Sequence, residues 1–140
     1  MTTFGTAVWR GGLKDGKGAI ATKSGALNEY PYGFASRFEG KPGTNPEELI
    51  GAAHAGCFTM ALSLILEQAG FKADEMNTKA EITLEKQGDG FAITKSHLTL
   101  RAKIPDIDDA KFKELTGMAE KGCPVSKVLK AEITLDAALV

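Results

Sequence analysis

"NPEELIGAAHAGCFTMALSLILEQAG", residues 45–70, is the stretch of the chain that decides the fold, because it predicts one long helix. Asn45 can serve as the N-cap, and Pro46 fits the first helical position, where a missing N–H costs no hydrogen bond. Gly70 supplies a residue at which a helix commonly stops. We therefore expect a helix that runs to about Ala69.

The middle of this helix carries no formal charge. The uncharged run, Leu49 to Leu66, approaches the roughly 20 residues of a membrane span. It is rich in glycine and alanine, contains His54, and has acidic rather than basic flanks. A helix that is apolar all round usually lies inside the core of a soluble protein. We expect that placement and no membrane partner.

Composition bounds the class of protein. The 140 residues are enough for one compact domain, residues 1–140, and 43% hydrophobic with 25% charged residues is ordinary for a globular protein. A net charge of −1 and a pI near 6.1 argue against nucleic acid or anionic lipid as partners. The start, "MTTFGTAVWR", has no apolar signal core, so we expect a cytoplasmic protein. Two cysteines there should stay reduced, unless they pair transiently.

The rest of the chain alternates between strand and helix signals. Strands are expected where apolar and polar residues alternate with period two, and helices where capping residues precede a run that ends at glycine. The expected strands are residues 5–10, 18–23, a short one near 34–38, 78–87, 91–104 and 131–139. The other expected helices are 104–122 and a short turn at 123–130. This order predicts an α+β fold, with strands towards both ends of the chain and helices between them.

Cys57 is the first candidate for chemistry. Apolar surroundings in the middle of a helix raise the pKa of a thiol and leave it inert, so on local sequence it reads as a small buried residue. Reactivity requires a nearby cation. The strongest candidate is Arg37 in "FASRFEGKPG", although it could equally be a solvated surface charge.

Two glutamates begin the same helix. Glu47 lies ten positions before Cys57 and about 80° from its direction, whereas Glu48 faces the opposite side. Ten residues also correspond to roughly 15 Å of rise, too far for contact. Glu47 could therefore act on Cys57 only through a bridging side chain such as Arg37, or in the site of a second subunit. The alternative is that both glutamates merely complement the helix dipole.

Cys123 and His54 are further candidates. Cys123 directly precedes Pro124 at an expected helix start, where free backbone N–H groups favour a thiolate; the alternative is a loop cysteine without a role. His54 shares a helix side with Cys57, which allows a nucleophile pair, half of a metal site, or simply a packed histidine. A four-ligand zinc site would also need His97 and would use every Cys and His of the chain.

Three motifs together resemble a known family. They are "PYGFASRFEGKPGTNPEELIGAAHAGCFTMALSLIL", "FAITK" and "GCPVSKVLKAEITLD", in this order. They resemble the OsmC branch of the OsmC/Ohr family, the osmotically inducible and organic hydroperoxide resistance proteins, from Trp9 onward. The resemblance implies an α+β fold with two long central helices wrapped by antiparallel sheets in an intertwined homodimer, with its sites at the subunit interface.

The resemblance also implies roles for four residues. Cys57 matches the peroxidatic cysteine of the AAHAxCF motif, and Cys123 matches the resolving cysteine of the GCPVS motif. Arg37 matches the arginine that holds the thiolate, and Glu47 matches the acid that orients this arginine. No metal, haem or flavin is implied.

The implied activity is that of a thiol-dependent peroxidase in defence against oxidative and osmotic stress. It would reduce organic hydroperoxides to alcohols through a Cys57 sulfenic acid and a Cys57–Cys123 disulfide. An external dithiol, lipoyl-type rather than thioredoxin, would recycle it. Phe58, Met60 and Leu62 are candidates for an apolar wall that favours organic peroxides. Two rivals stay open: a hydrolase that uses Cys57 with His54, and a redox-sensing or ligand-binding module without turnover.

Overall fold

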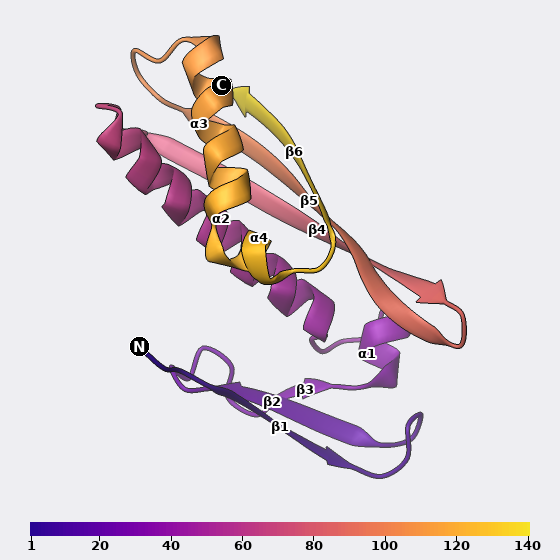
Figure 1. The fold of residues 1–140 in the computed structure, drawn as a ribbon. Coiled ribbons are helices and arrows are strands. Elements are labelled where there is room, and N and C mark those ends of the chain that lie inside the picture. Colours follow the sequence, from indigo (N-terminus) through magenta and orange to yellow (C-terminus); the bar gives the residue numbers. More distant parts are fainter. The chain divides into compact units, whose positions relative to one another are not determined.

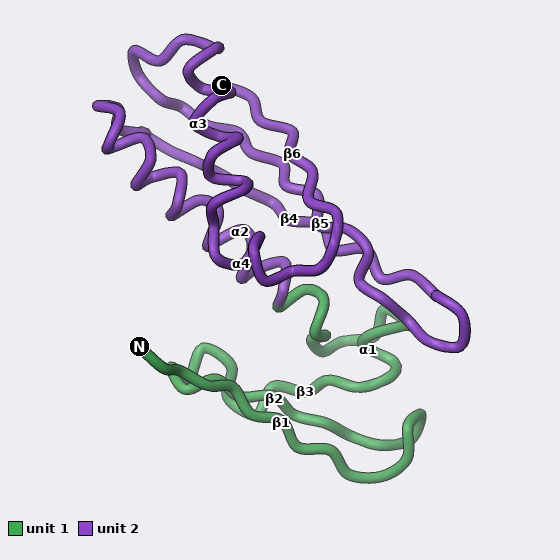
Figure 2. The backbone as a smooth tube through the Cα atoms, in the orientation of Figure 1, with its two compact units in different colours: residues 1–49 green, residues 50–140 purple.

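The computed structural model describes all residues, 1–140, which form four helices and six strands (Figure 1). The chain divides into two compact units, Met1–Leu49 and Ile50–Val140 (Figure 2). Each unit holds one three-stranded sheet, so the α+β class is confirmed. The expectation of a single domain over residues 1–140 stays a prediction.

The first unit is built on a small antiparallel sheet. Strands β1 (Gly5–Arg10), β2 (Lys17–Thr22) and β3 (Tyr30–Tyr32) pair in the order β1-β2-β3. The expected hairpin of the first two strands is confirmed. The rings of Trp9 and Tyr32 meet edge to face with centroids 5.6 Å apart. They do so over Gly18, where an added Cβ would come within 2.5 Å of the tyrosine ring.

The prediction of a short strand near residues 34–38 is wrong. This segment forms the helix α1 (Phe34–Phe38), and the strand lies earlier, at β3. Ser36 explains the difference. Its Oγ accepts a hydrogen bond from the Gly33 N–H at 2.9 Å and lies 2.9 Å from the Thr44 carbonyl, to which it can donate. A serine that satisfies the first backbone N–H groups favours a helix start over a strand.

Helix α2 (Pro46–Gln68) forms as the sequence predicts. The Asn45 Oδ1 accepts from the Glu48 N–H at 2.8 Å, and Gly70 ends the helix with φ +87°. By length and composition alone α2 could span a membrane. One of its faces, however, packs on the sheet of the second unit: the buried residues recur every three or four positions, at Gly51, His54, Phe58, Leu62 and Leu66.

The second unit contains a mixed sheet. Strands β4 (Glu75–Gln87) and β5 (Gly90–Lys103) form the expected antiparallel hairpin, with a register shift at Thr83/Leu84. Strand β6 (Glu132–Leu139) pairs parallel to β5, so the sheet is not wholly antiparallel as the resemblance implied. Helices α3 (Asp109–Gly122) and α4 (Pro124–Val128) explain this, since they carry the chain back before β6 begins.

The core of the second unit lies between this sheet and the helices α2 and α3. Alternate residues of β5, Leu98, Leu100 and Ala102, are fully buried. They meet Phe58 of α2 and Phe112 of α3 in one hydrophobic cluster. Helices α2 and α3 therefore cover the same face of the sheet, and the end of α3 delivers Cys123 into this core.

Candidate thiol site

The two cysteines, 66 positions apart in the sequence, come together at the start of α4. Cys57 on α2 is partly buried and Cys123 is fully buried, and both are free thiols. The Val125 N–H donates to Cys57 Sγ at 3.5 Å, and the Ser126 N–H donates to Cys123 Sγ at 3.3 Å. Cys123 is the N-cap of α4, so its expected position at a helix start is confirmed.

The immediate surroundings of Cys57 oppose ionisation. Burial raises the pKa of this thiol, the Val125 N–H partly offsets that effect, and the neighbouring Cys123 thiol raises the pKa further. The expectation drawn from the apolar sequence around Cys57 is thus confirmed. A thiolate at this position requires a positive charge from elsewhere.

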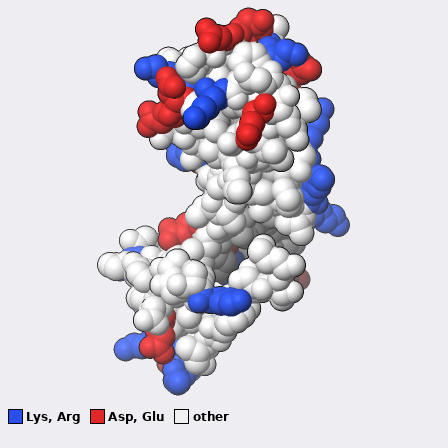
Figure 3. Space-filling model, turned by 90° about the vertical axis from the view of Figure 1, so that its left-hand side faces the viewer, with Lys and Arg blue, Asp and Glu red and all other residues white.

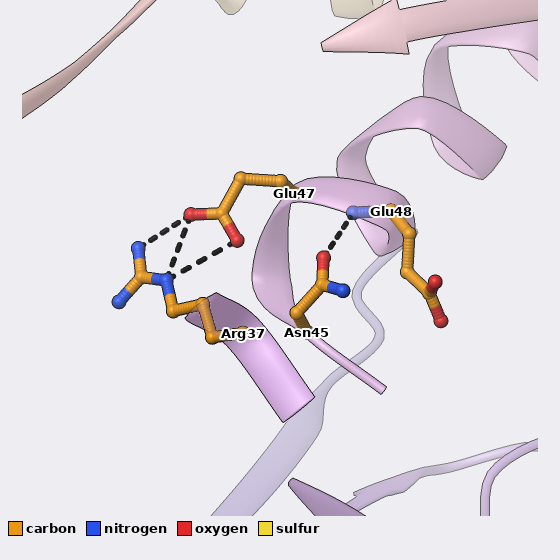
Figure 4. A network of polar contacts seen from close by, with 4 residues as sticks. All are labelled: Arg37, Asn45, Glu47 and Glu48. Atoms are coloured by element: carbon orange, nitrogen blue, oxygen red, sulfur yellow. Dashed lines mark hydrogen bonds and ion pairs between the residues drawn. The ribbon is translucent and has the colours of Figure 1, made fainter. Parts of the chain in front are cut away.

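Arg37 and Glu47 form an ion pair in the first unit (Figure 4). Arg37 Nε lies 3.0 Å from Glu47 Oε1 and 3.2 Å from Oε2, and Nη2 lies 2.5 Å from Oε1. Arg37 comes from the end of α1 and Glu47 from the first turn of α2. Arg37 is therefore held by a carboxylate rather than freely solvated. Glu48 bonds Thr44 Oγ1 instead, at 2.7 Å.

An aromatic pocket of about 200 Å³ adjoins the guanidinium of Arg37 within the first unit. It is apolar apart from this arginine, and its walls include Trp9, Leu13, Tyr32, Phe34 and Phe38. Trp9 and Leu13 were not among the residues that the sequence indicated for a site. The high aromatic content of "PYGFASRF" was the available signal for a pocket here.

The apolar wall expected from the neighbours of Cys57 is not found within the chain. Phe58 and Leu62 are both 0% exposed and belong to the hydrophobic core. Their positions on the helix direct them to the sheet, together with His54, because residues four apart share a helix face. Met60 lies outside this stripe and is 79% exposed.

His54 is fully buried and uses both ring nitrogens. Its Nδ1 lies 2.6 Å from Ser96 Oγ, and its Nε2 lies 2.7 Å from Ser126 Oγ. Burial lowers the pKa of His54, so the ring is neutral at pH 7. Neither nitrogen bonds Cys57, which removes the direct Cys–His pair that a hydrolase needs. Ser96 had no signal in the sequence, and Ser126 is the last residue of the GCPVS motif but had no role assigned from it.

The zinc arrangement considered from the sequence does not assemble either. His97 bonds Thr134 Oγ1 at 2.5 Å, on residues of β5 and β6. No group of three or more His, Cys, Asp or Glu side chains is arranged to hold a metal ion.

On the face drawn in Figure 3, the charged side chains lie in groups that contain lysine or arginine as well as aspartate or glutamate. No large patch of one sign is seen on this face, and wide areas between the charged side chains are uncharged. The thiol pair and the ion pair belong to different compact units, residues 50–140 and 1–49.

The family model of OsmC-like proteins matches residues 38–138. This chain belongs to the OsmC-like family. It is 57% identical over 132 residues to Peroxiredoxin OsmC of Escherichia coli (strain K12), covering 94% of this chain and 92% of that protein. It is 31% identical over 117 residues to the organic hydroperoxide resistance protein OhrB of Bacillus subtilis, covering 83% of this chain and 84% of that protein.

The fold agrees with this membership. The crystal structure of B. subtilis OhrB superimposes with a TM-score of 0.73 at 28% identity, covering 100% of this chain and 98% of that one. The OsmC-like protein of Mycoplasma pneumoniae reaches a TM-score of 0.76 at 15% identity and shows the shared fold. The expected OsmC-like fold is therefore confirmed.

Proposed function

We propose that this OsmC-like chain is a peroxidase that reduces organic hydroperoxides, with Cys57 as the attacking thiol and Cys123 as the resolving thiol. The peroxidase class follows from the family and from 57% identity to Peroxiredoxin OsmC. The observation that carries the finer assignment is the meeting of two free thiols at the start of α4.

Ordinary thiol chemistry supplies the steps. The Cys57 thiolate attacks the terminal peroxide oxygen, the O–O bond breaks, and the alcohol leaves once its oxygen takes up a proton. Cys57 is then a sulfenic acid. Cys123 attacks its sulfur, water leaves, and a Cys57–Cys123 disulfide forms. An external dithiol restores both thiols by two exchange reactions, and we propose a lipoyl-type dithiol rather than thioredoxin.

Arg37 is the proposed source of positive charge for Cys57. The thiol needs one, because its own surroundings raise its pKa. The guanidinium is oriented by Glu47 through Nε and Nη2, which limits the directions in which it can point. Glu47 itself lies ten residues, or about 15 Å, before Cys57 on α2, so it acts through Arg37.

A homodimer is part of the proposal. The side of α2 that faces away from the sheet exposes small and apolar residues, namely Ala52, Ala53, Gly56, Met60 and Leu64. Small residues allow two helices to approach closely, and an uncovered apolar helix face favours association. We propose that a second copy covers this face and that the sites lie at the subunit interface. We further place the protein in the cytoplasm, in defence against oxidative and osmotic stress.

The proposed substrate preference rests on the aromatic pocket beside Arg37. Its walls offer burial to an alkyl or aryl group, which hydrogen peroxide lacks. The purified protein should therefore show a higher kcat/KM for cumene hydroperoxide than for hydrogen peroxide. Equal values for the two peroxides would contradict the preference.

The experiment that tests the mechanism is a thiol count after one equivalent of cumene hydroperoxide. The wild type should lose both thiols. The Cys123→Ser variant should give a sulfenic acid at Cys57 that a dimedone probe traps. Unchanged thiols in both proteins would refute the mechanism, whereas oxidation without turnover in the presence of any dithiol would favour a sensor.

A further inference from the structure

A continuous line of hydrogen bonds ends at the buried thiol of Cys123. It begins at Ser96 on β5, whose Oγ lies 2.6 Å from His54 Nδ1. It continues from His54 Nε2 to Ser126 Oγ at 2.7 Å, and from Ser126 Oγ to Cys123 Sγ at 3.2 Å. The four side chains come from three separate segments of the sequence, on α2, on β5 and at the start of α4. Of the four, only Cys123 has a role in the proposed mechanism.

One arrangement of protons satisfies every link. The Cys123 S–H donates to Ser126 Oγ, and the Ser126 O–H donates to His54 Nε2. The single ring proton of neutral His54 then lies on Nδ1 and donates to Ser96 Oγ. His54 is 0% exposed, and its burial keeps the ring neutral, so Nε2 remains an acceptor at pH 7. These hydrogen bonds therefore lead from the Cys123 S–H, through Ser126, to His54 Nε2, which can accept a proton.

We propose that Ser126 and His54 accept the proton of Cys123 when this thiol attacks the oxidised Cys57. The inference rests on the proposed function, because it concerns the resolving step. Ser126 touches the reacting sulfur, whereas His54 acts through Ser126 and is a positioning residue. The backbone N–H of Ser126, which donates to Cys123 Sγ at 3.3 Å, stabilises the sulfur once the proton has left.

The step is balanced without a further reactant. The Sγ–Sγ bond forms as the S–O bond of the Cys57 sulfenic acid breaks. The proton of Cys123 moves to Ser126 Oγ while the hydroxyl proton of Ser126 moves to His54 Nε2. The departing hydroxide takes up one proton and leaves as water, and His54 later releases the proton that it gained. The net change is one sulfenic acid and one thiol converted to one disulfide and one water.

Few titratable side chains are buried in the second unit. On β5 the buried positions are Ser96 and apolar residues, and on α3 they are apolar residues and Thr116. Among all buried residues of this unit, the side chains that titrate are His54 and Cys123. Cys57, on the same helix as His54, is partly buried.

The test separates the two chemical steps in the full-length protein. The wild type and the variants His54→Gln and Ser126→Ala each receive one equivalent of cumene hydroperoxide. Sulfenic acid formation is followed with a dimedone probe and disulfide formation by thiol loss, from mildly acidic to alkaline pH. In both variants, disulfide formation should be about 100-fold slower at neutral pH, because a positioned base contributes about that much.

The pH profile distinguishes proton transfer from a merely structural effect. The deficit should shrink as the pH rises, because hydroxide from the solvent can then replace the relay as the base. Ser126→Thr restores a hydroxyl and should recover most of the rate. His97→Gln is the matched control, since His97 also bonds a hydroxyl, that of Thr134, but reaches no cysteine. This control should leave both steps unchanged.

Each outcome decides the inference. Thermal unfolding will show whether His54→Gln folds. If it does not, the variants Ser126→Ala and Ser126→Thr decide the inference. Ser126 is only partly buried, and Ser126→Ala keeps the hydrogen bond from the backbone N–H of residue 126 to Cys123 Sγ. Wild-type rates and an unshifted pH profile in Ser126→Ala overturn the relay. A rate deficit that is constant at all pH values also overturns it. A wild type that forms no disulfide instead overturns the proposed function itself.

Discussion

Arg37 and Glu47 carry full opposite charges on side chains that are 36% and 12% exposed, whereas Cys57 and Cys123 are neutral thiols in and beside an apolar core. The ion pair is held by short charged hydrogen bonds between two side chains. The thiols are held mainly by backbone N–H groups and by Ser126. The ion pair supplies charge without a nucleophile, and the thiol pair supplies nucleophiles without charge.

This difference shows why reactivity at Cys57 cannot be inferred from either region alone. Burial keeps the thiols close and protected from water, but it raises the pKa of Cys57. In the ion pair, two side chains of opposite charge are in contact and both are partly exposed to solvent. The variants below change the thiols, the ion pair or the proposed subunit interface, one at a time.

The largest effect is expected for Cys57→Ser, which removes the proposed nucleophile. Peroxidase turnover should fall by at least about 1,000-fold, as for other enzymes that lose their nucleophile. Cys123→Ser is the matched variant: it should still reduce one equivalent of peroxide but lose sustained turnover with a dithiol. Coupled-assay kinetics and single-turnover measurements distinguish the two. Sustained turnover by Cys57→Ser would contradict the assignment.

The Arg37→Ala variant should have the next largest effect. In the proposed mechanism Arg37 supplies the positive charge that stabilises the Cys57 thiolate, so its removal should raise the pKa of Cys57 further. Less thiolate is then present at neutral pH, and the second-order rate with peroxide should fall by about 100-fold there. The deficit should disappear at alkaline pH.

The control for this variant is Arg101→Ala. Arg101 also pairs with a carboxylate, that of Asp136 at 3.3 Å, on exposed residues of the sheet of the second unit. Its removal should leave the pH profile of peroxide reduction unchanged. If the pH profile of peroxide reduction is identical in Arg37→Ala and wild type, the ion pair has no part in the thiol chemistry.

Met60→Glu tests whether a second copy brings the two regions together. Met60 is 79% exposed on the outer face of α2, and a charge there should weaken the proposed dimer by at least about tenfold in Kd. Met118→Glu introduces the same charge on α3, where Met118 is 50% exposed, and should leave the dimer intact. Sedimentation velocity over a concentration series measures both. A monomeric wild type would contradict the proposed interface.

The smallest effect is expected for Glu47→Gln. The amide can still accept from Arg37, so only the charge that orients the guanidinium is lost. Since a partly exposed ion pair contributes up to about 1 kcal/mol, the rate should fall by roughly fivefold or less. Glu48→Gln should change nothing measurable, because Glu48 bonds Thr44 and not Arg37. Equal rates for both variants at every pH would argue against an orienting role.

The sequence predicted most of the elements but not all of their pairing. The bounds of α2 followed from Asn45 and Gly70, because capping and left-handed residues act within a few positions. The aromatic residues of the segment 34–38 are compatible with a strand, whereas the hydrogen bonds of Ser36 start a helix there. Parallel pairing of β6 with β5 was not foreseen, since pairing direction depends on the path of the connecting helices.

The residues of the site were also predicted only in part, because some of their contacts depend on the path of the chain. The sequence identified Cys57 and Cys123 as candidate thiols. It also indicated Arg37 as a candidate cation and Glu47 as an acid that could act through it, and the structure joins these two in an ion pair. Ser96 belongs to none of the motifs, and Ser126 belongs to the GCPVS motif without an assigned role. Their importance comes only from the burial of His54 between them.

By itself the sequence determined where the long helix α2 begins and ends, which residues could react, and to which family the motifs point. These properties depend on residue type and on contacts within a few positions along the chain. The tertiary structure alone decided that thiols 66 positions apart meet at α4, and that His54 joins Ser96 to Ser126 instead of pairing with Cys57. Such neighbours result from the packing of α2, β5 and α4 against one another, and local sequence does not encode that packing.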